Sequence, residues 1–469
     1  MITLGVEIFD MTRTVCVFLC ALGAVLPVAA FEMILDAGAA GLLDATPCLQ
    51  RAVDAISAAG GGRLIVPAGN YVVGGLELKS DVELHIAEDA ALLSVTNTDW
   101  FPKDAPKSTI WARGATNVAV TGRGTVNGRG KFFDRVVSRK PFRLRGGWRT
   151  MHWIGCRGVR VEGVTILGGT GWTCKLDYCD GVVYRGVKMR SHANYTNDGI
   201  DILSRNVLVE DCNIDAEDDA IVFKTEKEWQ VVTNVIVRNS RLRSTSAVVK
   251  FGTETHGRFR DVKVYNCSIA CDMPSSTIAP HNAPGEVRDV RNHAISGIEI
   301  SSVDGASLED VVISNIVMGA GINTPVFVRL ARRNESRIEG GACLRNVLLS
   351  DIRMMEPSTS AIACSISGVP GLRPQNVTIR NSRFLFGGGG SAANAAEVYL
   401  DERDKAFPMP IALFKSPLPA YGFYVRHADG VRFENVQLVK MGADARPPVV
   451  ADDSAVTILE CNFEVNERK

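Results

Sequence analysis

Three acidic residues, Asp198, Asp218 and Asp219, stand in two short motifs whose spacing suits acid–base chemistry. The first motif is T-N-D-G-I-D at residues 196–201, and the second is E-D-D-A-I at residues 217–221. Like charges held close together push their pKa values apart, so one group stays protonated while another is ionised near neutral pH. A proton donor beside a carboxylate is what acid–base hydrolysis of a glycosidic bond requires.

The segments around these motifs repeat a strand-and-turn phrase, N/D/G-V-x-h-x-N/D/G, in which h is apolar. Successive central copies open 23, 25, 28 and 27 residues apart. Short β-branched strands at this period, punctuated by Asn and Gly, are typical of a β-solenoid. The phrase opens at Asn117, Gly158, Gly181, Asn206, Asn234, Asp261, Asp310, Asn346, Asn376 and Gly430.

Stacked coils would bring the acids together. Neighbouring coils of a parallel β-helix lie about 4.8 Å apart, and Asp198 and Asp218 are 20 residues apart, nearly one coil. In an extended segment Asp219 would point away from Asp218, unless a turn bends it back. The alternative is that the acids only build turns, which Asp favours. We favour turn building for Asp201, Asp211 and Asp215, and function for the other three, whose clustering carries an electrostatic cost.

Both motifs resemble those of glycoside hydrolase family 28, the polygalacturonase-like, pectin-degrading enzymes. The family signature is N-T-D-G-I-D followed one coil later by G-D-D-x-I-x-x-K, and the second motif here continues as E-D-D-A-I-V-F-K. The resemblance extends from about residue 44 to about residue 436. It implies an all-β chain: a single right-handed parallel β-helix (a pectin-lyase-like solenoid) with a short N-terminal capping helix near residues 49–59.

The resemblance also implies roles. Asp218 matches the family's general acid, and Asp198 and Asp219 match the pair that activates water in an inverting hydrolysis. A gap of about 6.5–9.5 Å between acid and base would leave room for that water.

Two segments depart from the family pattern at positions that bear on the substrate. The family's G-H-G segment has no histidine counterpart in residues 246–254, and its R-I-K segment, which holds a galacturonate carboxylate, aligns with G-I-E-I-S-S at residues 297–302. Glu299 and Ser301 therefore replace two cations. We expect a neutral or mixed sugar, although another uronic acid remains an alternative.

Further residues are candidates for binding the substrate. Lys224 and Lys250 are 26 residues apart and could bind a sugar hydroxyl or carboxylate or lower a neighbouring pKa, or they could be solvated surface lysines. Arg329 stands in an apolar strand and needs a partner. Glu254 and Glu299 complete the set. Trp172 could stack on a sugar or pack a loop.

Three functions remain open: a glycoside hydrolase; a polysaccharide lyase, which would need a cation such as Ca²⁺ and a base such as Lys250; and a non-catalytic adhesin or tailspike-like binding protein. We expect a polysaccharide or oligosaccharide partner and no cofactor. The cysteines and histidines show no zinc spacing, so no metal is expected either.

Composition and the N-terminus suggest the compartment. Lys+Arg and Asp+Glu both total 52 in 469 residues, so no global charge would attract nucleic acid. Residues 1–30 read as a secretory signal peptide, which would leave residues 31–469 as one β-helix catalytic domain, secreted or periplasmic, with no membrane span.

Residues 272–294 and 387–414 interrupt the repeat, and we expect long turns there. The oligomeric state is open.

Overall fold

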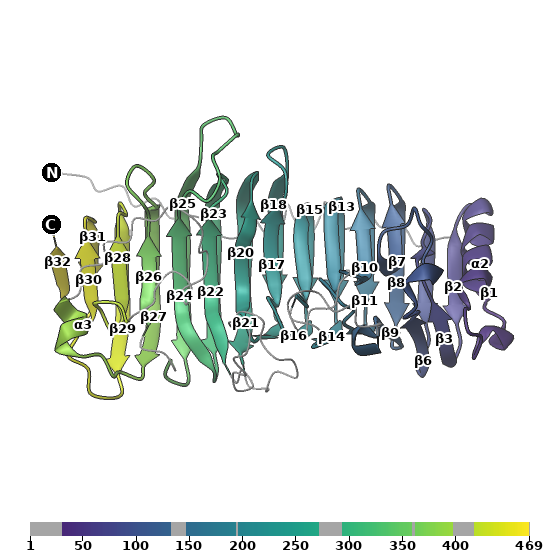
Figure 1. The fold of residues 1–469 in the computed structure, drawn as a ribbon, viewed down its shortest axis with the longest axis horizontal. Coiled ribbons are helices and arrows are strands. Elements are labelled where there is room, and N and C mark those ends of the chain that lie inside the picture. Colours follow the sequence, from purple (N-terminus) through teal and green to yellow (C-terminus); the bar gives the residue numbers. More distant parts are fainter. Residues whose placement is uncertain are drawn as a thin grey trace, which may run out of the picture.

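The structure is a computed structural model that describes residues 31–132, 147–193, 196–271, 293–358, 362–396 and 417–468. Over these residues the chain winds into coils stacked along one long axis (Figure 1). The named strands pair in parallel from the first coil to the last. The predicted all-β parallel β-helix is confirmed. The signal segment and most of the two predicted long turns lie outside the described residues.

Strands of successive coils stack into three ladders. Ladder A contains β1 (Glu32–Ile34), β2 (Gly62–Val66), β5 (Val82–Ile86), β8 (Thr116–Gly122), β11 (Arg157–Glu162), β13 (Cys174–Arg185), β15 (Ile200–Glu210), β18 (Val231–Arg238), β21 (Arg258–Ala270), β23 (Ser307–Met318), β25 (Cys343–Met354), β27 (Gln375–Phe386), β29 (Val431–Lys440) and β31 (Val456–Leu459). Ladder B contains β3 (Gly69–Val73), β6 (Ala90–Ser94), β9 (Thr125–Asn127), β12 (Thr165–Leu167), β14 (Lys188–Ser191), β16 (Asn213–Ala216) and β19 (Arg241–Ser244), and continues through the ends of β21 to β29.

Ladder C carries all five candidate substrate-binding residues. It contains β4 (Leu76–Glu77), β7 (Ser108–Arg113), β10 (Arg149–Ile154), the first residues of β13 and β15, and then β17 (Ile221–Thr225), β20 (Ala247–Thr255), β22 (Ala294–Ser302), β24 (Ile322–Leu330), β26 (Cys364–Ser367), β28 (Phe423–Arg426), β30 (Val449–Asp452) and β32 (Val465–Arg468).

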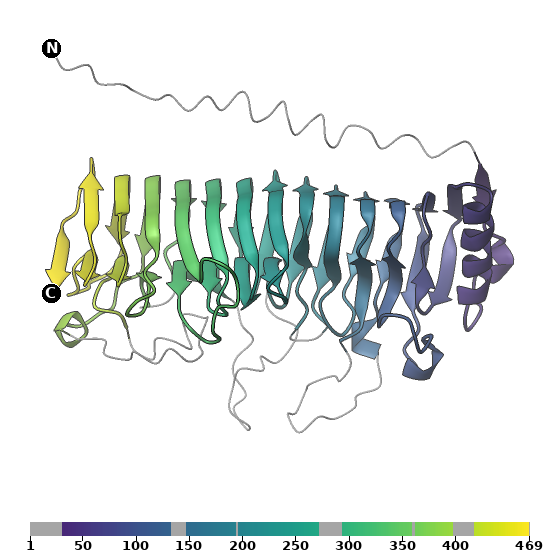
Figure 2. The ribbon, with the colours of Figure 1, turned by 90° about the horizontal axis from the view of Figure 1, so that it is seen from above.

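Helix α2 (Thr46–Ala58) covers one end of the stack, as Figure 2 shows. A proline in its first turn suits the start of a helix, and Leu49, Val53 and Ile56 are buried. The predicted capping helix is therefore confirmed. The other helical elements are short: η1 (Ala37–Ala39), η2 (Thr98–Trp100), η3 (Gly130–Phe132) and α3 (Ala392–Ala396). No helix in the described part of the chain is long and apolar enough to cross a membrane.

The opening residue of the repeat has a conformational reason. All ten opening positions have φ between 51° and 76°, in the left-handed region that Gly, Asn and Asp tolerate best. The asparagines also bond from coil to coil; the Asn234 amide donates to the Asn206 side-chain oxygen at 2.7 Å. This residue therefore both turns the chain and connects neighbouring coils.

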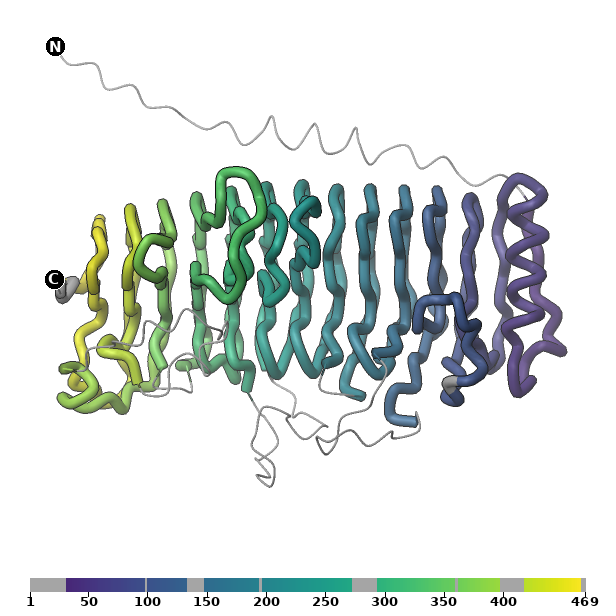
Figure 3. The backbone as a smooth tube through the Cα atoms, turned by 45° about the horizontal axis from the view of Figure 1, so that its top comes forward, coloured from purple at the N-terminus to yellow at the C-terminus, as the bar shows by residue number. Residues whose placement is uncertain are grey.

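Alternation along the strands separates the core from the outer face. Phe223 and Phe251 point inward on ladder C with ring centroids 4.5 Å apart. The residue that precedes each phenylalanine points to the opposite face of the strand. In this row Val222 pairs with Lys250, and Lys250 pairs with Glu299 in the next coil. The stacked coils seen in Figure 3 thus arrange outward side chains in rows along the axis.

Candidate active site

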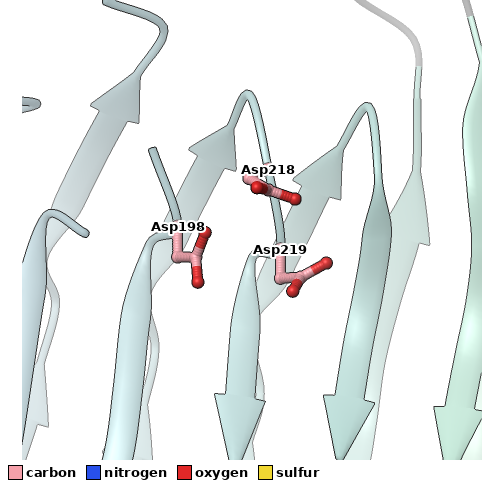
Figure 4. Close-up of side chains that lie close together, drawn as sticks. All are labelled: Asp198, Asp218 and Asp219. Atoms are coloured by element: carbon pink, nitrogen blue, oxygen red, sulfur yellow. The ribbon is translucent and has the colours of Figure 1, made fainter. Parts of the chain in front are cut away.

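The three acids lie at the corner where the chain passes from ladder B to ladder C. Asp198 lies two residues before the start of β15, and Asp218 and Asp219 lie between β16 and β17. A bend at residues 217–218 turns the two neighbouring aspartates toward the same side. Figure 4 shows the three side chains close together, and one oxygen of each lies within 4.8 Å of the others.

Other residues of the first motif shape the turn that holds Asp198. The buried amide of Asn197 donates to the carbonyl groups of Gly169 and Gly171 in the preceding coil, at 3.0 and 2.6 Å. A Cβ at Gly199 would lie 2.4 Å from the carbonyl oxygen of Ala220, so only glycine lets the two coils approach here.

Asp218 and Asp219 differ in environment. Asp218 is partly exposed, and burial of its carboxyl, together with the charge of Asp219, raises its pKa to about 7 despite the opposing charge of Lys250. Asp219 is buried, and its carboxylate accepts a bond from the Ala247 amide at 3.1 Å and pairs with Lys250 Nζ at 3.0 Å. Asp218 is therefore suited to donate a proton, and Asp219 to accept one.

This assignment predicts a pH dependence. Because a proton donor must be protonated, kcat/KM for a reaction catalysed by Asp218 should fall about tenfold per pH unit above about pH 7. The measurement is an initial-rate profile at subsaturating substrate. An alkaline limb that begins near pH 5, the range of an ordinary carboxyl, would contradict the assignment.

Lys224 and Asp201 enter the same cluster. Lys224 Nζ lies 3.0 Å from Asp198 Oδ2, 2.8 Å from Asp201 Oδ1 and 3.7 Å from Glu254 Oε2. It also lies 3.7 Å from the ring centroid of Trp172, a cation–π distance. The turn-building interpretation of Asp201 is wrong: its side chain is fully buried in β15 and paired with Lys224.

The remaining substrate-binding candidates have different surroundings. Lys250 Nζ lies 3.8 Å from the Glu299 carboxyl, whose other oxygen accepts a bond from the Ser296 hydroxyl at 2.8 Å. Arg329, in β24, is 6% exposed and donates to the Ser367 hydroxyl and the Gly368 carbonyl. Of the five candidates, only Glu254 has a substantially exposed side chain, at 37%.

A buried histidine contacts two acids, one in the second motif and one just before it. Both ring nitrogens of the buried His192 lie 2.8 Å from carboxylates, Nδ1 from Glu217 and Nε2 from Asp215. Burial opposes the charged form, but these two bonds raise the pKa of His192 to about 9. The turn-building interpretation of Asp215 is therefore wrong as well, because Asp215 lies in β16 and forms an ion pair with His192. Asp211 alone matches the turn-building expectation, with φ of 56° in an exposed position.

Sequence reasoning missed Asp201 and the contact of Trp172 with a lysine. A signal for Asp201 was present, because Ile200 and Ile202 on either side of it are apolar and buried. A period of two then places Asp201 on the outer face of ladder C, where Lys224 also lies. No sequence pattern marked Trp172 as a partner of Lys224.

The chain is similar to known carbohydrate-active proteins. Residues 57–270 match the model for glycosyl hydrolases family 28. A probable polygalacturonase of Vitis vinifera is 25% identical over 252 residues, which cover 46% of this chain and 50% of that protein. The chain thus spans about half the length of the curated relatives it matches.

Solved structures share the fold over most of the chain. A hyperthermoactive exopolygalacturonase from Thermotoga maritima matches with a TM-score of 0.61 at 18% identity, covering 88% of this chain and 92% of that one. PfbA, a surface adhesin of Streptococcus pneumoniae, matches with a TM-score of 0.59 at 14% identity, covering 89% and 93%. These likenesses agree with the predicted right-handed β-helix, but an enzyme and an adhesin share it, so the fold alone does not assign a function.

Proposed function

We propose that this chain, a relative of glycosyl hydrolases family 28, is a glycoside hydrolase that cleaves O-glycosidic bonds of a pectin-like or other complex polysaccharide. The observation that carries the proposal is the cluster of Asp198, Asp218 and Asp219 within 4.8 Å. A screen of plant and algal polysaccharides for new reducing ends tests it. Absence of release across a broad panel would favour the binding-protein alternative.

In the proposed mechanism Asp218 protonates the leaving glycosidic oxygen, while Asp219, with Asp198, takes a proton from the attacking water. Inversion of the anomeric centre is proposed from the family resemblance. The closest carboxyl oxygens are nearer than the 6.5–9.5 Å typical between inverting carboxyl groups, so spacing does not support it. Proton NMR of the first-formed product would decide the stereochemistry.

A lyase is the second enzyme class to test, and the lysines argue against it. A lyase base must be neutral to accept a proton. Burial disfavours the charged form of Lys250, but Asp219 and Glu299 overcome this and raise its pKa well above the ordinary value. We therefore expect activity to survive addition of a chelator and products to lack the unsaturated sugar that a lyase generates. Loss of activity that Ca²⁺ restores would support the lyase.

We expect unmodified polygalacturonate to be a poor substrate compared with neutral or mixed glycans. A fixed Arg or Lys pair is the natural receptor for a sugar carboxylate. Here Glu299 and Ser301 stand at those positions, Lys224 and Lys250 already pair with buried acids, and Arg329 donates to protein oxygens. The comparison is initial rates on polygalacturonate, rhamnogalacturonan and neutral glycans at equal mass. If polygalacturonate is cleaved fastest, this inference is wrong.

Secretion or export to the periplasm is likewise proposed, from the apolar segment within residues 1–30. Activity in the medium or periplasm of an expressing cell, with the mature N-terminus near residue 31, would support it. We propose that residues 31–469 act as one catalytic unit, because a solenoid grows along one axis.

A further inference from the structure

Two buried lysines beside the acids each connect two carboxyl groups. In what we call the first bridge, Lys224 lies between Asp198 and Asp201, with Nζ at 3.0 and 2.8 Å from their nearest oxygens. All three residues are at most 3% exposed. The ring of Trp172 lies against the ammonium group, so little water can screen these charges.

The second bridge lies in the next coils. Lys250 Nζ is 3.0 Å from Asp219 Oδ2 and 3.8 Å from Glu299 Oε1. These three residues are also at most 3% exposed. Among the residues that the structure describes, Glu299 Oε1 has no hydrogen-bond partner, so its charged form would depend on Lys250 at 3.8 Å.

The charges of the two bridges do not balance if every group is ionised. Four carboxylates would face two ammonium groups, which leaves two net negative charges in the interior. An uncompensated buried ion costs several kcal/mol, and buried acids usually bind a proton instead. We propose that each bridge holds one proton in addition to its lysine, which makes Asp201 and Glu299 positioning residues that set the charge of the acid cluster.

The surroundings indicate where the protons reside. In the first bridge burial raises the pKa of both Asp198 and Asp201, against the opposing charge of Lys224; such a pair titrates as a unit and shares its proton. The other charged groups facing it are Asp218, Asp219, Lys175 and the partly exposed Glu254.

In the second bridge the proton belongs to Glu299. Burial raises the pKa of Glu299 to about 7, with Lys250 opposing and the charges of Asp219 and Asp218 adding to the rise. Asp219 instead accepts the Ala247 amide and pairs closely with Lys250, which suits a carboxylate. If the proposed hydrolysis is correct, Asp219 is the ionised base and Asp198 orients the water as part of a proton-sharing pair.

Infrared spectroscopy of the full chain tests the proton content without any substrate. With the aspartate carboxyl groups labelled with ¹³C, wild type should show two protonated aspartates at about pH 6, from Asp218 and the first bridge. Asp201→Asn should lose one protonated carboxyl. Asp211→Asn, in an exposed turn, is the matched control and should leave the signal of the protonated aspartates unchanged. Loss of an ionised group in Asp201→Asn would overturn the proposal.

Glutamate labelling tests the second bridge separately, should Asp201→Asn not fold. Glu299→Gln should lose one protonated glutamate at about pH 6. A loss of ionised glutamate instead would show that Glu299 is an ordinary ion-pair partner of Lys250 and would overturn the second bridge.

Activity profiles add a readout that rests on the proposed function. In Asp201→Asn, Asp198 pairs with Lys224 alone and is fully ionised. Because its charge interacts with Asp218, the pKa of Asp218 should rise and the alkaline limb of kcat/KM should move to higher pH. Glu299 releases its proton at about pH 7 and then adds a negative charge near Asp218. In Glu299→Gln that charge never forms, so the alkaline limb should move to lower pH. Unmoved limbs in both variants would overturn the positioning roles. If even wild type releases no reducing ends, the proposed function fails while the infrared result still decides the bridges.

Discussion

Replacing Asp218 by asparagine should lower turnover by about 10²–10⁴-fold while the fold survives, because the amide cannot donate the proton that the leaving oxygen needs. Asparagine keeps the shape of the side chain, and the bond from the Ser244 hydroxyl to the backbone carbonyl of residue 218 would remain. The measurement is kcat on the best substrate from the reducing-end screen, with thermal unfolding as the check on folding.

The matched control is Asp211→Asn, which lies in the same coil, between β15 and β16. Asp211 is exposed and has φ of 56°, a conformation that asparagine adopts as readily as aspartate. Its activity and stability should equal those of wild type. A folded Asp218→Asn protein with nearly normal turnover would refute the role of Asp218 as acid and move the search to Asp198.

The β-helix was predictable because its repeat has a steric cause. Positions such as Asn206, Asn234 and Asn376 open the repeat with φ of 54° to 56°, and only Gly, Asn and Asp adopt that conformation at little cost. The valine that follows each is buried. Local conformational preference and core packing therefore agree in these coils, which makes such a pattern reliable.

The acid cluster was predictable for a geometric reason. Neighbouring coils lie about 4.8 Å apart, so residues one coil apart at the same corner meet without any further information. The bend at residues 217–218, which turns Asp218 and Asp219 to the same side, did not follow from the spacing. It depends on bonds from Ser244 and Thr245 in the next coil to this turn.

The charge partners could not be read from the sequence. For Lys224 and Lys250 the sequence leaves both substrate binding and a solvated surface position open. Both lysines are buried between carboxyl groups, so the solvated-surface alternative is wrong. The burial of these lysines depends on which neighbouring coils and turns lie over ladder C. The repeat phrase carries no information about those tertiary contacts. Asp201 was misread for a related reason, since its preference for turns is a local property and its contact with Lys224 is a tertiary one.

The stacking of coils that assembles the site also produces strong repulsion between its acids. A solenoid repeats its corner residues at a fixed short distance, so acids placed there for chemistry repel one another unless cations stand between them. Lys224 and Lys250 supply those cations in consecutive coils. The stability of this part of the helix should therefore depend on the lysines far more than on ordinary surface ion pairs.

Lys224→Met should accordingly destabilise the protein by about 3–5 kcal/mol near pH 7, because it leaves Asp198 and Asp201 buried without a counter-charge. Methionine retains most of the side-chain volume, so the loss reports charge rather than packing. The measurement is the free energy of unfolding from urea titrations. Lys263→Met is the matched control, since Lys263 forms only a partly exposed pair with Asp261 and its removal should cost less than about 1 kcal/mol.

The pH dependence of the Lys224→Met defect separates this explanation from a packing defect. Burial raises the folded-state pKa of Asp198 and Asp201 above the unfolded value of about 3.9, and removing Lys224 removes the charge that opposes this rise. The folded variant then binds more protons than the unfolded chain, so its stability falls as pH rises above about 4 and comes closest to that of wild type below it. A deficit of equal size at low and neutral pH would mean that Lys224 stabilises the coil by packing alone, and the charge argument for both bridges would fail with it.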